Sequence, residues 1–140
     1  MVLARREEAL RRAPFFADLP KRHLRSIARF TTETGYKEGA VVVKEGTIGS
    51  AFYVILDGRA KVVRGTRTIA RLAPGDFFGE ISLLDGGPRV ATVVAETPLL
   101  VLDLAGKDFR DLLAGEPILA LRILAVVAQR LRGRERPLVG

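Results

Sequence analysis

Residues 78–93 hold the side chains whose types and spacing best support chemistry in this chain. An acid, Glu80, and a base, Arg89, stand nine residues apart, separated by an apolar stretch, by Asp85 and by Gly86-Gly87-Pro88. A helix that begins just after Gly79 would point free backbone N–H groups, and the positive end of its dipole, at an anion. Arg89 can add two coplanar donors to a phosphate, and Glu80 can accept a hydrogen bond from a sugar hydroxyl. The segment therefore suits a small ligand that carries both a phosphate and a hydroxyl.

This segment resembles the phosphate-binding cassette of the cyclic nucleotide-binding domain family, which includes protein kinase A regulatory subunits, catabolite activator protein and cyclic-nucleotide-gated channels. The matching positions are Phe78, Gly79, Glu80, Ile81, Leu83, Arg89, Ala91, Thr92 and Val93. The resemblance implies that Glu80 binds the ribose 2′-hydroxyl and that Arg89 binds the cyclic phosphate. It also implies that backbone N–H groups complete the cradle, namely those around Gly79, Glu80, Ile81 and Ser82 and those of Val90 and Ala91.

The resemblance extends to the nucleotide base. In this family a hydroxyl residue directly after the arginine often accompanies cyclic GMP, and Val90 offers no hydroxyl, so cyclic AMP is expected before cyclic GMP. Val90 could equally be a strand residue with no effect on selectivity. The strand that contains Ile69 and Ala70 would line the purine pocket, or simply the core. Arg130 and Arg134 are candidates to stack on the purine, or they form a solvated basic helix end.

The order of elements predicts a mainly β domain with flanking helices. Helices are predicted over residues 4–12, 21–30, 107–113 and 117–132. Between them lie short β-branched runs separated by glycine and proline turns, which favour a sandwich or a barrel without deciding between them. The resemblance implies an eight-stranded β-roll of the jelly-roll type. The strands predicted from the runs are Ala40–Val43, Ala51–Leu56, Ala60–Arg64, Thr68–Leu72, Thr92–Ala95 and Leu99–Leu102.

The length of 140 residues predicts a single domain. The expected parts are N-terminal helices over 1–33, a β-roll over 34–104, C-terminal helices over 105–133 and a tail over 134–140.

The last predicted helix is apolar on almost every side from Ile118 to Ala128. Such a helix must be covered on more than one face. Leu121, Leu124, Ala128 and Leu131 follow the four–three spacing of a coiled-coil seam. This pattern leaves two interpretations open: a homodimer or protein partner on this helix, or packing against the N-terminal helices.

The composition excludes several kinds of site. The sequence has no cysteine and one histidine, His23, so disulfides and thiolate chemistry are excluded and no metal site is expected. His23 lies among basic residues and is expected at the surface. Asp103 is expected in a turn. No nucleophile triad, Walker loop or dinucleotide fingerprint is present. We therefore expect no catalytic residues, no enzyme activity and no cofactor apart from the nucleotide ligand.

The net charge of +7 lies mainly in the flanking segments, with +5 over residues 1–32, −1 over 33–103 and +3 over 104–140. Solvated helix faces are the favoured interpretation, and an acidic partner, anionic lipid or nucleic acid is the alternative. The apolar run 118–128 contains Arg122 and is too short to span a bilayer. The charged N-terminus does not match a signal peptide, so a cytoplasmic location is expected.

These observations predict a regulatory module that binds a cyclic nucleotide and signals through movement of its C-terminal helix to a partner or dimer mate. One alternative is the ligand-sensing part of a transcription regulator of the catabolite-activator type. Since eight residues follow Arg132, this chain alone is not expected to bind DNA. A scaffold that binds no nucleotide is the other alternative.

Overall fold

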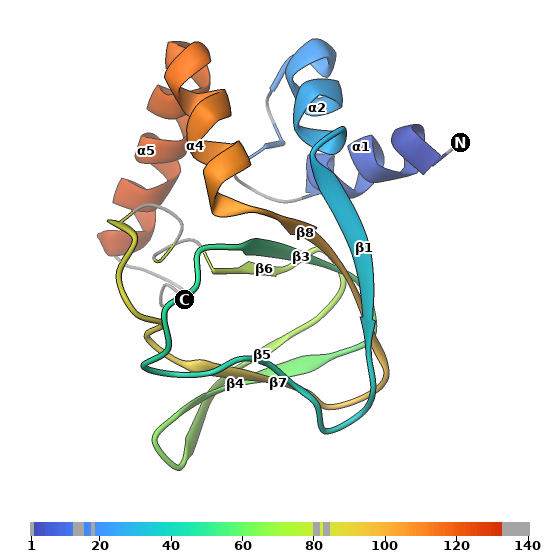
Figure 1. The fold of residues 1–140 in the computed structure, drawn as a ribbon, viewed down its shortest axis with the longest axis vertical. Helices are drawn as coiled ribbons and strands as arrows, with labels where there is room; N and C mark the ends of the chain where they lie inside the picture. The colour runs from blue at the N-terminus through green and yellow to red at the C-terminus, as the bar shows by residue number, and fades with distance from the viewer. Residues whose placement is uncertain (1, 13–15, 18, 80–81, 83–84, 133–140) are drawn as a thin grey trace.

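The computed structural model describes residues 2–12, 16–17, 19–79, 82 and 85–132 (Figure 1). Within these residues the strands form two four-stranded antiparallel sheets, with strand orders β1-β8-β3-β6 and β2-β7-β4-β5. The predicted mainly β roll with flanking helices is confirmed. The strands are β1 (Thr31–Tyr36), β2 (Val41–Val43), β3 (Phe52–Asp57), β4 (Ala60–Arg64), β5 (Arg67–Leu72), β6 (Phe77–Phe78), β7 (Thr92–Ala95) and β8 (Leu99–Leu104). The helices are α1 (Val2–Arg12), α2 (Lys21–Ala28), α4 (Gly106–Gly115) and α5 (Pro117–Leu131).

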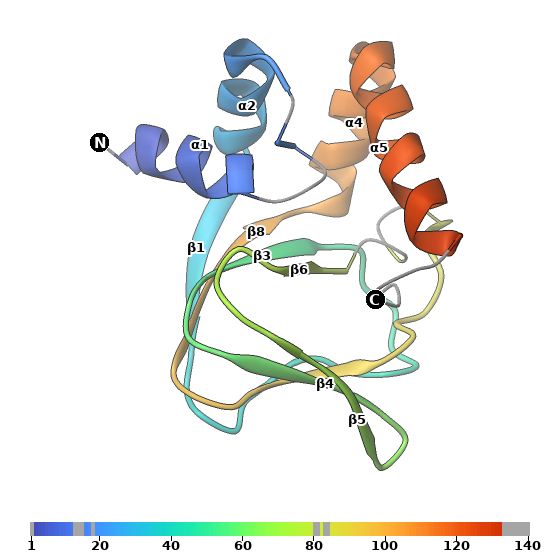
Figure 2. The same ribbon diagram turned by 180° about the vertical axis from the view of Figure 1, so that it is seen from behind.

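The helices gather on one side of the roll, against the sheet that contains β3 and β8, and both views show the β4–β5 hairpin farthest from them (Figures 1 and 2). Phe52 and Val54 of β3 pack into the core beneath these helices. Phe52 meets Phe16 edge-on with ring centroids 5.8 Å apart, and it stacks with Phe109 of α4 at 6.4 Å. These aromatic contacts join both helical segments to the same strand.

The opposite face of β3 fills the interior of the roll. Tyr53 and Ile55 alternate with the helix-facing residues and pack against Val62 and Val93 of the second sheet. Because both faces of β3 are covered, its residues Phe52 to Ile55 are all buried. This continuous apolar strand is the element on which the candidate site is built.

Two strands differ from the sequence prediction, which contains neither β1 nor β6. β1 reads Thr-Thr-Glu-Thr-Gly-Tyr, and only Thr31 in it is buried. Its backbone pairs with β8 along its whole length. Backbone pairing leaves no apolar pattern in the sequence, so the sequence does not predict the strand. β6 has two residues, too few to give a periodic pattern.

The predicted surface position of His23 is wrong. The residue is 5% exposed, and its Nδ1 lies 3.4 Å from Oε2 of Glu116, the residue between α4 and α5. His23 shares the buried face of α2 with Leu24 and Ile27, because residues three and four apart lie on one side of a helix. The turn predicted at Asp103 is also wrong, since Asp103 lies within β8.

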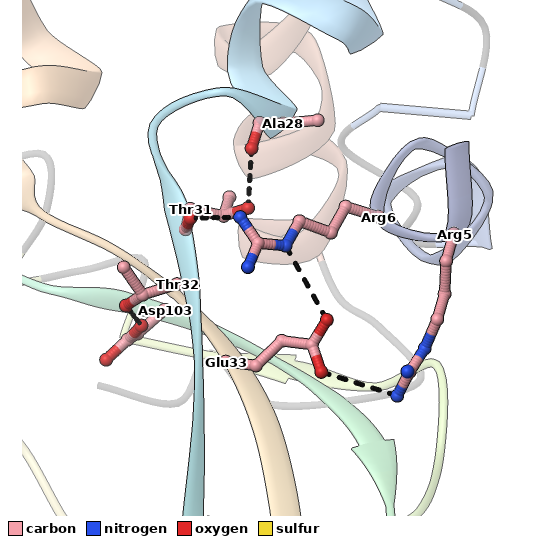
Figure 3. Close-up of polar contacts among 7 residues, drawn as sticks. All are labelled: Arg5, Arg6, Ala28, Thr31, Thr32, Glu33 and Asp103. Atoms are coloured by element: carbon pink, nitrogen blue, oxygen red, sulfur yellow. Dashed lines mark hydrogen bonds and ion pairs between the residues drawn. The ribbon is translucent and has the colours of Figure 1, made fainter. Parts of the chain in front are cut away.

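Polar contacts fix α1 and β1 in place (Figure 3). Nη1 of Arg6 donates to the carbonyl of Thr31 at 2.7 Å. Glu33 of β1 lies 3.4 Å from Arg5 and 3.5 Å from Arg6. On β8, which pairs with β1, Asp103 accepts a hydrogen bond from Thr32. The polar composition of β1 therefore serves to attach the first helix to the roll.

The helix α5 has one buried and one exposed apolar face. Leu119 and Ile123 are each 1% exposed and belong to the core beneath the helices. Ile118, Leu121 and Leu124 are 62%, 66% and 57% exposed. Among the described side chains of α5, intramolecular packing therefore covers one apolar face and leaves the other exposed. Among the described residues, no helix is both long enough and apolar enough to cross a membrane.

Candidate ligand-binding site

The backbone of Arg89 is held against the loop between β2 and β3. Its N–H donates to the carbonyl of Thr47 at 2.8 Å, and its own carbonyl accepts from the N–H of Gly46 at 2.8 Å. Pro88 and Ile48 form an isolated antiparallel bridge beside this pair. These contacts fix the point at which the Arg89 side chain enters the protein.

The side chain of Arg89 lies in the interior, and the residue is 4% exposed. Nη1 donates to the backbone carbonyl of Ala51 at 3.1 Å. The guanidinium carbon lies 6.0 Å from the centre of the Tyr53 ring. Burial lowers the pKa of Arg89, while the nearby Tyr53 acts in the opposite direction. A desolvated guanidinium in this position is suited to a phosphate, which would supply a negative charge and matching acceptors.

Two glycines allow the backbone to approach Arg89 closely. At Gly79 the φ angle is +98°, and a Cβ would lie 2.5 Å from the carbonyl oxygen of Ala51 and 3.3 Å from Nη1 of Arg89. At Gly49 a Cβ would lie 3.2 Å from both Nε and Nη2 of Arg89. Gly79 therefore has a local reason to be glycine, since other residues rarely adopt this φ and have no space there.

Ser82 is fully buried, and its hydroxyl has no hydrogen-bond partner in the described structure. The carbonyl of Ser82 accepts from the N–H of Gly86 at 2.9 Å, which is the spacing of a helical turn. Asp85 then accepts from the N–H of Gly87 at 2.7 Å. The bond between Gly86 and Ser82 agrees with the turn expected within the cassette. A buried hydroxyl without a partner is unusual in a folded protein.

The remaining cassette and purine-pocket candidates lie around the interior of the roll. Ala91 is fully buried, and Val90 is half-buried with its carbonyl accepting from Nε of Arg64 at 3.3 Å. Ile69 and Ala70 are half-buried on β5 and pack against the inner core. This position agrees with the core interpretation of these two residues, while their role at a purine stays a prediction.

Four candidates fall outside what the structure describes. Glu80, Ile81 and Arg134 are not among the described residues, and Arg130 lies in α5 with a side chain that is not described. The roles of Glu80 at the ribose and of the arginines at the purine therefore stay predictions.

Three contacts of Arg89 involve residues that the sequence analysis does not identify as part of the site, namely Gly49, Ala51 and Tyr53. Ala51 is 38 residues from Arg89 in the chain. No motif joins these positions, and the backbone contacts of the β2–β3 loop together with the pairing of β3 place them beside the arginine.

Comparison with known proteins assigns the family. The model of the cyclic nucleotide-binding domain matches residues 33–116, a span that includes the cassette, Arg89 and the strands that hold it. The chain belongs to the cyclic nucleotide-binding domain family. The resemblance drawn from residues 78–93 is thereby confirmed.

The relatives of this cyclic nucleotide-binding domain include bacterial and eukaryotic proteins. It is 36% identical to the cyclic AMP receptor protein of Thermus thermophilus over 102 residues, which are 69% of this chain and 47% of that protein. It is 37% identical to the cAMP-dependent protein kinase regulatory subunit of Yarrowia lipolytica over 106 residues, covering 74% of this chain and 28% of that protein. The chain thus spans half or less of the length of these curated relatives.

The solved structures agree with this fold. The N-terminal domain of a transcriptional regulator from Streptomyces coelicolor A3(2) superposes with a TM-score of 0.79 at 33% identity, covering 89% of this chain and 90% of that one. Domains of this family are regulatory modules without catalysis of their own, which confirms the prediction that the chain is not an enzyme. Among the described residues, no group of three or more His, Asp or Glu side chains could hold a metal ion.

Proposed function

We propose that this cyclic nucleotide-binding domain binds cyclic AMP in preference to cyclic GMP and transmits the binding event through α5. The observation that carries the proposal is the buried guanidinium of Arg89, 4% exposed and bonded to Ala51. A cation held this firmly in a desolvated site is prepared to bind a phosphate, because little side-chain entropy remains to be lost.

The choice of cyclic AMP rests on two supports. Val90, directly after Arg89, offers no hydroxyl to a guanine. The two relatives described above are named as a cyclic AMP receptor protein and as a cAMP-dependent protein kinase regulatory subunit. Both supports favour adenine, and cyclic GMP is the second ligand to test.

The signal is proposed to leave through the exposed face of α5, formed by Ile118, Leu121 and Leu124. Leu119 and Ile123, on the other face, connect the helix to the core that contains Phe52. A nucleotide shifts the helix only by its difference in affinity for two helix positions. We assign a second copy of this domain as the occupant of the exposed face, since an apolar helix face of this kind is typical of helix pairing.

The test is thermal unfolding of the purified protein, freed of co-purified nucleotide, with excess cyclic AMP, cyclic GMP or 5′-AMP. Ligand at about a hundredfold over its dissociation constant stabilises a protein by roughly 2.7 kcal/mol, which raises the midpoint by several degrees. We expect this shift with cyclic AMP, a smaller one with cyclic GMP and none with 5′-AMP. Arg89→Ala should abolish it. An unchanged midpoint with every nucleotide would favour the scaffold alternative instead.

A second candidate is the ligand-sensing part of a transcription regulator. It is favoured by the match to the transcriptional regulator domain from Streptomyces coelicolor, of which this chain covers 90%. The downstream reading frame discriminates the two, because a regulator of this type carries a helix-turn-helix segment after the long helix.

A further inference from the structure

Tyr53, the second residue of β3, lies against two residues of the cassette, Phe78 and Arg89. Its ring stacks on Phe78 with centroids 4.7 Å apart and an angle of 16° between the planes. The two residues are also paired in register across β3 and β6. Phe78 directly precedes Gly79, so the Tyr53 ring supports the point where the cassette begins.

The same ring faces the guanidinium of Arg89, whose carbon lies 6.0 Å from the ring centre. Tyr53 is 8% exposed and Arg89 is 4% exposed. A guanidinium is attracted to the face of an aromatic ring within about 6 Å, and the attraction is stronger where water is excluded. The contact is therefore formed in the environment in which it is most favourable.

The residue directly before β3 supplies the polar contact that orients Arg89. The carbonyl of Ala51, two residues before Tyr53, accepts a hydrogen bond from Nη1 at 3.1 Å. The ring and this carbonyl act on one planar group, so together they restrict its rotation as well as its position. A phosphate that meets an oriented guanidinium loses less entropy on binding.

We propose that Tyr53 is a positioning residue for phosphate recognition. Its ring holds the Arg89 guanidinium in a fixed position relative to Phe78, where the cassette begins. This inference rests on the proposed function, since it assigns to Arg89 the phosphate of a cyclic nucleotide. The ring, rather than the hydroxyl, carries the role, because the stacking on Phe78 and the contact with the guanidinium both use the ring face.

The experiment measures the dissociation constant for cyclic AMP by calorimetry in Tyr53→Phe and Tyr53→Leu, both checked for folding by urea unfolding. We expect Tyr53→Phe to bind within about twofold of the parent and Tyr53→Leu to bind about tenfold more weakly or worse. Tyr36→Leu is the matched control, because Tyr36 packs against the same inner core. It should lower stability without a comparable loss of affinity.

Two further measurements separate positioning from a general effect on the fold. In a protein that already carries Arg89→Lys, Tyr53→Leu should reduce the affinity for cyclic AMP much less than it does in the parent. The reason is that lysine lacks the planar group that the ring orients. The ³¹P signal of bound cyclic AMP should move toward its free value in Tyr53→Leu and stay in place in Tyr36→Leu. If Tyr53→Leu does not fold, Tyr53→Met replaces it, since methionine fills irregular space.

The inference would be overturned if folded Tyr53→Leu bound cyclic AMP as tightly as the parent does. It would also be overturned if Tyr53→Leu reduced the affinity equally in the parent and in Arg89→Lys. Failure of the parent to bind any cyclic nucleotide would instead overturn the proposed function, and the inference with it. The parent titration, made first, distinguishes these outcomes.

Discussion

Nδ1 of His23 lies 3.4 Å from Oε2 of Glu116, so that α2 is joined to the point where α4 ends and α5 begins. The histidine is buried, whereas the side chain of Glu116 is 39% exposed. The contact connects the N-terminal helices to the base of the helix that is proposed to carry the signal. Its two partners differ in burial and should therefore differ in what they contribute to stability.

His23→Ala should lower the free energy of unfolding by about 2 kcal/mol, because it removes a buried ring from a packed helix face. Glu116→Gln should lower it by less than about 1 kcal/mol, since a polar contact to a partly exposed carboxylate contributes little. Urea unfolding measures both. Ser26→Ala is the control on the same helix, because its hydroxyl bonds within α2 to the carbonyl of Arg22. Equal losses at His23 and Glu116 would show that the pair itself, rather than burial, stabilises the joint.

Gly79→Ala should destabilise the fold by about 3 kcal/mol or more, because it combines a φ of +98° with a Cβ 2.5 Å from the carbonyl of Ala51. Gly86→Ala is the matched control, with a φ of +70° and nothing within 4 Å of its Cβ. It should lower the free energy of unfolding by about 1 kcal/mol, because only the strain of the positive φ angle is added. Urea unfolding measures both variants. Similar losses of unfolding free energy at the two sites would mean that a small shift of the backbone removes the close contact at Gly79.

Gly49→Ala should weaken cyclic AMP binding with little effect on stability. Its Cβ would lie 3.2 Å from Nε and Nη2 of Arg89, so the guanidinium must move by a few tenths of an ångström. We expect a loss of affinity of roughly three- to tenfold by calorimetry. Gly35→Ala is the control, since its Cβ meets only the carbonyl of Leu99 at 3.9 Å. An unchanged affinity in Gly49→Ala would indicate that Arg89 does not need its present orientation.

Ser82→Ala should raise the free energy of unfolding of the nucleotide-free protein by about 1 kcal/mol, because it removes a buried hydroxyl without a partner. Affinity for cyclic AMP should change little, since the backbone N–H of Ser82 is the group assigned to the phosphate. Thr47→Ala should have the opposite effect on stability, because that hydroxyl donates to the carbonyl of Lys44 at 2.6 Å. A large loss of affinity in Ser82→Ala would assign the hydroxyl itself to the ligand.

Stability should fall at alkaline pH because of two tyrosines. Burial raises the pKa of Tyr36 above 10.0, with a further contribution from Asp103, and burial also raises the pKa of Tyr53. The folded state therefore keeps its phenol protons at a pH where the unfolded chain loses them. The contribution of these two phenols to the free energy of unfolding is fully present below pH 10.0. It is lost as the pH rises through the pKa values of the folded state.

Urea unfolding between about pH 9 and about pH 11 measures this decline. Tyr36→Phe should reduce its slope, because one raised phenol is removed and the second loses a neighbour that raises its pKa. A slope equal to that of the parent would show that these phenols do not control alkaline unfolding.

The sequence by itself determined the family and the position of the cassette. Gly79, Arg89 and the turn between them lie within residues 78–93, so their spacing is visible without any fold. The apolar runs also predicted strands such as β3 and β4, and the 117–132 pattern predicted α5 closely. These features are local, because propensity, turn residues and hydrophobic periodicity act over a few residues.

Only the tertiary structure decided what surrounds Arg89 and which polar residues are buried. Ala51 and Tyr53 reach the arginine through the pairing of β3 within the roll. β1 is held by backbone pairing and by contacts with α1, neither of which leaves an apolar pattern. His23 is buried on the inner face of α2, beside Glu116 between α4 and α5. Each of these outcomes depends on residues far apart in the chain, and it is the folded arrangement that brings them together.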